Sequence, residues 1–127
     1  MGVEHHCEAV VVSCIDYRFQ GYLKDFLYEN LKDKTFDYIG FAGSTKDLDI
    51  IMGQIEISVR LHNIKRAVLI HHEDCGAYGA EGSLARHTQD LLKAKTEINE
   101  KFPSLNVDLY YLKLDGSFVD ISASEPE

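Results

Sequence analysis

Short apolar runs alternate with longer amphipathic segments along the chain. Four runs rich in β-branched or aromatic residues predict strands, at residues 8–13, 36–41, 67–70 and 107–114. Between them, apolar residues at three- and four-residue spacing predict helices, over roughly 19–32, 48–63 and 83–101. Ser44 or Thr45 is a candidate N-cap for the second helix, and residues 118–121 could add a short edge strand.

This order of elements predicts the fold class. Strands that alternate with helices of this length favour an α/β fold, in which a mostly parallel central sheet of four to five strands is flanked by helices. A chain of 127 residues favours a single domain over 1–127 and can bury a core without disulfides. Ligands of such sheets collect outside the carboxyl ends of the strands, so those ends are the places to look for chemistry.

Composition and charge narrow the classes of function. The chain has 13 Lys and Arg against 21 Asp and Glu, and a net charge of −8 argues against a nucleic-acid partner. No apolar run approaches the roughly 20 residues of a membrane span, and the N-terminus lacks a signal-peptide layout. Three cysteines are few and odd in number, whereas a disulfide framework usually has a larger, even set. We therefore expect a cytoplasmic protein with reduced thiols.

Two strand ends carry candidate metal ligands. Cys14 follows the first predicted strand, and His72 and Cys75 follow the third. Cysteines often behave as small buried hydrophobes, but two thiolates and one imidazole at neighbouring strand ends are the ligands that zinc prefers. Three protein ligands leave a fourth position for water, whose pKa the metal lowers. We expect Gly76 to relieve crowding beside the second sulfur.

A carboxylate and a guanidinium follow the first of these ligands. Asp16 lies two residues beyond Cys14, and Arg18 is placed to grip its carboxylate in a bidentate pair. Held in this way, Asp16 could accept a hydrogen bond from the metal-bound water. Without that grip, Asp16 is close enough to become a fourth ligand and to close the site.

The two motifs together resemble a known family. Cys14-Ile15-Asp16-Tyr17-Arg18 and His72-Glu73-Asp74-Cys75-Gly76 are similar to the two signature motifs of the β-class carbonic anhydrases. The pattern Cys-x-Asp-x-Arg, followed about 58 positions later by His-x-x-Cys, is specific. Ala42-Gly43 also falls where the family has an Ala-Gly turn, and the resemblance covers most of residues 9–114. The chain is identified as a short, divergent member of that family.

The resemblance implies an activity and a set of roles. Cys14, His72 and Cys75 would bind one Zn²⁺ per chain, and Asp16 and Arg18 would hold the zinc-bound water as catalytic residues. The implied reaction is the interconversion of carbon dioxide and bicarbonate, in which zinc hydroxide attacks the carbon. Members of the family associate, so the resemblance also implies a homodimer or a higher even oligomer.

The region of the substrate pocket departs from the family. Gly43 and Gly76 are candidate pocket residues, but the family's Arg-Asn-Ala-Gly-Asn stretch is Gly40-Phe41-Ala42-Gly43-Ser44 in this chain. The change removes polar groups that line the pocket. Two alternatives therefore stay open: a related hydrolase acting on carbon disulfide or carbonyl sulfide, and a non-catalytic zinc-binding protein whose site Asp16 closes.

Other residues near the motifs have weaker functional interpretations. For His71 a structural hydrogen bond is favoured over a role as proton shuttle. Glu73 and Asp74 are expected to be solvated or capping, although either could orient His72.

Histidines outside the motifs receive similar interpretations. We expect His62 and His87 to be surface or boundary residues on their helices. His5, His6 and Cys7 form a compact candidate metal cluster, for which mobile terminal residues are the favoured interpretation.

Overall fold

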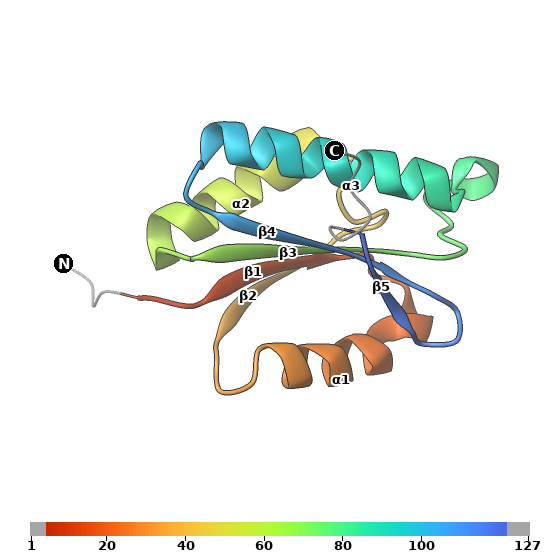
Figure 1. Ribbon diagram of the computed structural model, residues 1–127, viewed down its shortest axis with the longest axis horizontal. Helices are drawn as coiled ribbons and strands as arrows, with labels where there is room; N and C mark the ends of the chain where they lie inside the picture. The colour runs from red at the N-terminus through yellow and green to blue at the C-terminus, as the bar shows by residue number, and fades with distance from the viewer. Residues whose placement is uncertain (1–4, 122–127) are drawn as a thin grey trace.

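A five-stranded sheet forms the centre of the computed structural model, which describes residues 5–121 (Figure 1). The strand order is β2-β1-β3-β4-β5, with β1 to β4 parallel and β5 antiparallel to β4. This confirms the predicted α/β fold with its mostly parallel sheet. The strands are β1 (Ala9–Ser13), β2 (Phe36–Gly40), β3 (Arg66–His72), β4 (Asn106–Leu112) and β5 (Phe118–Asp120).

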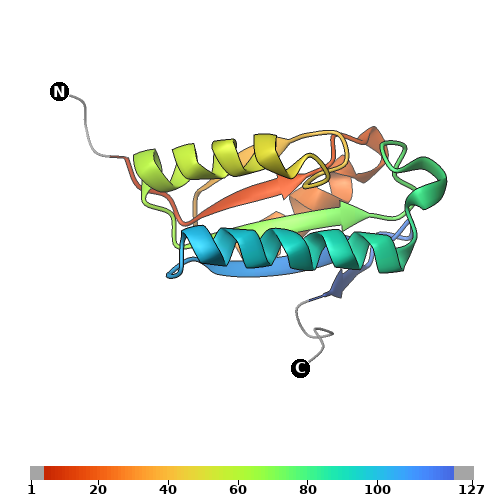
Figure 2. The ribbon, with the colours of Figure 1, turned by 90° about the horizontal axis from the view of Figure 1, so that it is seen from above.

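In the described part of the chain, three helices cover the two faces of the sheet. α1 (Gln20–Asn30) lies on one face, whereas α2 (Leu48–His62) and α3 (Leu84–Lys101) lie side by side on the other (Figures 1 and 2). Two short 3-10 turns, η1 (Tyr17–Phe19) and η2 (Gly79–Glu81), precede α1 and α3. Within residues 5–121, no helix has both the length and the apolar character that crossing a bilayer demands.

Strand β1 is buried on both faces of the sheet. Val10 and Val12 pack in the core beneath α2 and α3, while Ala9 and Val11 pack against α1. All five residues of β1 are buried, which is why the strand is a continuous apolar run without polar alternation. Because β1 pairs with both β2 and β3, the ends of β1 and β3 lie next to each other, as the predicted site requires.

The turn before α2 differs from the prediction. Asp47 is the N-cap of α2 and makes no side-chain capping bond, so neither Ser44 nor Thr45 caps the helix. Both of these side chains are buried and point to the sheet: Ser44 Oγ donates to a β1 carbonyl at 3.5 Å, and Thr45 Oγ1 lies 2.6 Å from His71 Nε2. The left-handed φ angles of Gly43 (84°) and Ser44 (57°) fold the chain back in this way.

Candidate metal centre

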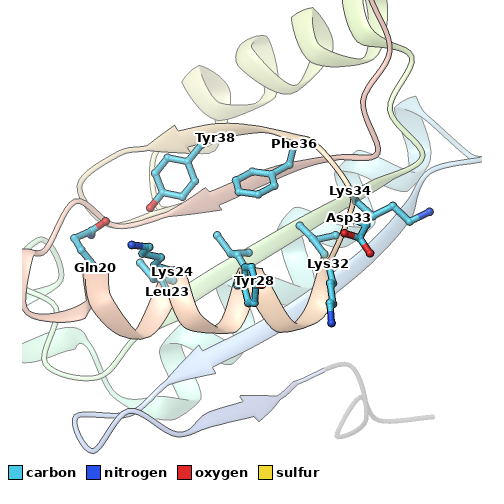
Figure 3. A pocket seen from close by; sticks show the side chains of 11 residues that line it. Gln20, Leu23, Lys24, Tyr28, Lys32, Asp33, Lys34, Phe36 and Tyr38 are labelled. Atoms are coloured by element: carbon cyan, nitrogen blue, oxygen red, sulfur yellow. The ribbon is translucent and has the colours of Figure 1, made fainter.

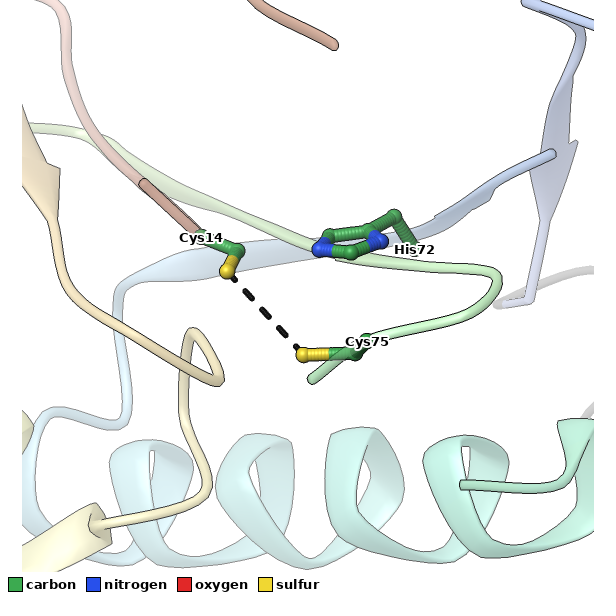
Figure 4. A group of neighbouring side chains, drawn as sticks. All are labelled: Cys14, His72 and Cys75. Carbon is green, nitrogen blue, oxygen red and sulfur yellow. Dashed lines mark hydrogen bonds between the residues drawn. The ribbon is translucent and has the colours of Figure 1, made fainter. Parts of the chain in front are cut away.

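Three side chains converge where β1 and β3 end. Cys14 directly follows β1, His72 is the last residue of β3, and Cys75 comes three residues later (Figure 4). All three are buried, and their ligand atoms lie within 4.8 Å of one another. The two sulfur atoms are 4.0 Å apart. Two thiolates at about 2.3 Å from a tetrahedral zinc would be about 3.8 Å apart, so the group fits such an ion.

The His72 ring is held in one orientation. Its Nδ1 lies 2.7 Å from the Glu73 carbonyl oxygen, so Nδ1–H donates and Nε2 keeps its lone pair. Nε2 is buried and has no hydrogen-bond partner among residues 5–121. A buried ring nitrogen of this kind fits a metal ligand, because coordination would satisfy it.

The environment of Cys14 favours its thiolate. The Gly43 N–H donates to Cys14 Sγ at 3.4 Å. Burial opposes ionisation, but the His72 ring in its protonated form and this amide outweigh it and lower the pKa of Cys14 to about 7. Burial raises the pKa of the Cys75 thiol, so Cys14 is the first of the pair to ionise. Gly43, a predicted pocket residue, thus contacts a candidate ligand directly.

Arg18 connects the two motifs. Its Nη2 lies 2.7 Å from Asp16 Oδ2 and its Nε 3.1 Å from Asp16 Oδ1, which is the predicted bidentate pair. The Arg18 guanidinium also donates to Asp74, at 3.0 Å to the carboxylate and 2.9 Å to the carbonyl. The Asp74 side chain is 70% exposed, which confirms its predicted solvation, but its contact with Arg18 was not predicted. One guanidinium holds the loop after β1 against the loop after β3.

The Asp16 carboxylate lies beside the cluster and is ionised. Hydrogen bonds from Arg18 are the main cause that lowers the pKa of Asp16 to about 2. Asp16 Oδ2 lies 3.9 Å from His72 Nε2, so the acceptor stands next to a candidate ligand atom. This arrangement can hold a cation and, beside it, accept a hydrogen bond.

Gly76 and Glu73 are neighbours of the cluster with predicted roles. A Cβ added to Gly76 would have no heavy atom within 4 Å apart from its two chain neighbours, so there is open space on this side, and the expected relief of crowding beside the Cys75 sulfur stays a prediction. Glu73 orients His72 through its backbone carbonyl, while its carboxylate accepts the Leu114 N–H at 2.8 Å. The expected orienting contact is therefore present, but the main chain makes it.

A second pair of histidines lies behind the cluster. His71 Nδ1 is 2.8 Å from His87 Nδ1, and His71 Nε2 is 2.6 Å from Thr45 Oγ1, in agreement with a structural role for His71. The predicted surface or boundary position of His87 is wrong, because His87 is fully buried. Its ring packs between Tyr78 and Tyr111, at centroid distances of 4.2 and 5.6 Å, since this turn of α3 faces the sheet.

One positioning residue was missed by the sequence analysis. The buried Phe19 ring packs on the His72 imidazole, with 4.3 Å between their centroids. The sequence could have indicated this role, because Phe19 directly follows the Asp16–Arg18 motif and lies four residues before the apolar Leu23.

One family matches nearly the whole chain in the comparisons with known proteins. Residues 4–122 match the sequence profile of a family described as "Putative carbonic anhydrase". An uncharacterised protein from Rickettsia bellii (strain RML369-C) is 30% identical over 141 positions, which cover 96% of this chain and 86% of that protein. Carbonic anhydrases from Glaciozyma antarctica and Streptococcus mutans have similar folds, with TM-scores of 0.66 and 0.65 at 15% and 16% identity. These alignments cover 94% and 95% of this chain and 85% of each of those structures.

Proposed function

Because the chain belongs to this carbonic anhydrase family, as its two motifs predicted, we propose that it is a zinc lyase that interconverts carbon dioxide and bicarbonate. The observation that carries the proposal is the cluster of Cys14, His72 and Cys75 beside an Asp16 carboxylate held by Arg18. These three side chains would hold one zinc ion. When bound, zinc supplies a water of lowered pKa as the nucleophile.

The chain's own residues would orient that nucleophile. Asp16 is ionised and accepts, so it would take a hydrogen bond from the water and direct a lone pair of the oxygen towards carbon dioxide. Arg18 contacts both carboxylate oxygens and limits the rotation of Asp16. The Glu73 carbonyl holds His72 in the tautomer that can ligate, and the Gly43 amide stabilises the Cys14 thiolate.

The same contacts favour an open coordination position over a closed one. Asp16 Oδ2 lies 3.9 Å from His72 Nε2 and is bound by Arg18 at 2.7 Å in a charge-assisted hydrogen bond. Ligation by Asp16 would break or weaken that charge-assisted bond. Loss of Arg18 would favour the non-catalytic alternative, in which Asp16 binds the metal and closes the site.

We also propose a homodimer, formed through the free edge of the sheet. Among residues 5–121, β2 pairs only with β1, and exposed aromatic side chains lie along it and on the adjoining α1: Tyr28, Phe36 and Tyr38. They line a groove of about 550 Å³ between α1 and β2 (Figure 3). A second copy related by a two-fold axis could pair its β2 with this one and cover both grooves. Light scattering after gel filtration tests this, and a monomer at every concentration would contradict it.

The decisive experiment is stopped-flow hydration of carbon dioxide by protein of measured zinc content. Cys14→Ser should lose the zinc of this cluster and the activity together. Asp16→Asn should keep zinc but lose rate, whereas the exposed-acid control Asp25→Asn should keep both. Zinc-loaded protein without hydration at any pH would overturn the proposal.

The altered 40–44 stretch motivates a parallel assay. Gly40 and Phe41 stand where the family has polar side chains, so carbon disulfide and carbonyl sulfide should be tested beside carbon dioxide. Turnover of either in preference to carbon dioxide would favour the hydrolase alternative. The reduced thiols that the site needs are the rule in the cytoplasm, where we propose that the protein works.

A further inference from the structure

A second group of ligand-type side chains lies at the opposite end of the sheet. Cys7 precedes β1, Asp37 lies in the edge strand β2, and His62 is the last residue of α2. Their sulfur, oxygen and nitrogen atoms all lie within 4.8 Å of one another. The Cys7 N–H also donates to the His62 carbonyl at 3.1 Å, which holds the segment before β1 against the end of α2.

The group is assembled around one carboxylate oxygen. Asp37 Oδ2 lies 2.6 Å from His62 Nδ1 and accepts from Ser58 Oγ at 2.6 Å. The ring of His5 lies beside that of His62, with 5.8 Å between centroids. A sulfur, a carboxylate oxygen and an imidazole nitrogen therefore meet at one point, with a further imidazole next to them.

We propose that Cys7, Asp37 and His62 form a second binding site, for a divalent ion of the zinc type, with His5 able to supply a fourth ligand. Thiolate, imidazole and carboxylate together suit zinc and cobalt, and disfavour magnesium and calcium, which prefer oxygen ligands. The site is independent of the proposed function, because it shares no residue with the cluster at Cys14.

The structure leaves room for the ion and a path to it. In a tetrahedral site, oxygen and nitrogen ligands would lie about 3.3 Å apart. Asp37 Oδ2 and His62 Nδ1 are 2.6 Å apart, so they would have to move apart by less than 1 Å to bind an ion. Both side chains are about 30% exposed, and together with Ser58 they line a surface groove of about 200 Å³. An ion can enter from that groove without opening the core.

Charge also favours a cation in this position, because the acidic side chain of Asp37 turns its Oδ2 towards the sulfur of Cys7 and the ring nitrogen of His62.

The test is the metal content of the folded protein. After loading with zinc and gel filtration, the wild-type chain should retain about two ions and Cys7→Ser about one. Cys7→Ser should hydrate carbon dioxide at the wild-type rate. Titration with cobalt should show the thiolate charge-transfer absorption of a one-sulfur site in Cys14→Ser/Cys75→Ser, and its loss when Cys7→Ser is added.

Matched variants keep the outcome interpretable. Asp37→Asn should lose the second ion, whereas Asp33→Asn, at an exposed turn whose left-handed φ suits asparagine, should retain it. Equal metal content in the wild-type chain and Cys7→Ser would overturn the proposal. The three side chains would then form a hydrogen-bonded network without a metal. If Cys7→Ser loses one ion but the wild-type chain does not hydrate carbon dioxide, only the proposed enzymatic activity is overturned.

Discussion

Gly43 is the position where a single methyl group tests the geometry of the candidate metal centre. Its φ of +84° is in the left-handed region, and its N–H donates to Cys14 Sγ. In Gly43→Ala, the new Cβ would lie 3.1 Å from Lys46 Cβ and 3.2 Å from Ala77 Cβ, closer than ordinary van der Waals contact. The turn must then shift, and the amide moves with it.

The expected loss of stability follows from these two effects. A left-handed φ costs a non-glycine residue roughly 1–2 kcal/mol, and the crowding adds to this, so we expect a total of about 2 kcal/mol or more. For a chain of this length, each kcal/mol corresponds to about 4 °C, so Tm should fall by about 8 °C. Zinc affinity should fall as well, because the Cys14 thiolate loses its hydrogen bond.

The assay is thermal unfolding by circular dichroism at one protein concentration, with zinc affinity from competition with a chromophoric chelator. Two other glycines are controls, because neither has a heavy atom within 4 Å of an added Cβ and neither has a left-handed φ. Gly53→Ala, in α2, should raise stability by about 0.5–1 kcal/mol, and Gly76→Ala should change it little. A Gly43→Ala protein with wild-type Tm and zinc affinity would refute the reasoning.

Three further predictions concern the core, acid stability and the thiols. Leu91→Ala, at a fully buried site, should cost about 2–5 kcal/mol in urea unfolding, whereas the exposed Leu61→Ala should cost less than about 1 kcal/mol; equal losses would contradict the proposed core. The folded-state pKa of Asp16 is about 2 against an ordinary 3.8, so its contribution to stability is present above about pH 4 and is lost as pH falls through about 2. Asp16→Asn should therefore show a shallower loss of stability over that window, and an unchanged slope would exclude the ion pair as its cause. In protein stripped by a chelator, alkylation of Cys14 should rise through about pH 7 and precede that of Cys75, and added zinc should suppress both, as mass spectrometry of the labelled peptides can show. Thiols alkylated equally fast with and without zinc would argue against their ligation.

Local pattern was enough to predict the fold and the convergence of the candidate ligands. The apolar run of β1 and the helical spacing of α1 carry information within a few residues, and parallel pairing then brings Cys14 near His72. Helix and strand boundaries differ from the predicted ones by a few residues, as at η1, where a 3-10 turn precedes α1.

The failures concern contacts that only the three-dimensional arrangement decides. His87 is buried because its turn of α3 faces Tyr78 and Tyr111, and a histidine in a helical pattern does not reveal which face it is on. Thr45 resembles a helix cap in sequence, but a buried histidine from β3 competes for its hydroxyl. Asp74 contacts an arginine 56 positions earlier, a separation that no local pattern reports.

The position of the candidate ligands along the chain constrains the order in which the protein can be assembled. Cys14 is synthesised before His72, which follows about 58 positions later, after α1, β2 and α2. The two meet only once β1 has paired with β3, a contact of long range in the sequence. In a zinc finger, closely spaced ligands gather an ion and fold around it, whereas we expect this chain to fold first and to bind a metal afterwards. We therefore expect chelator-stripped protein to keep its fold and to take up zinc again without passing through the unfolded state.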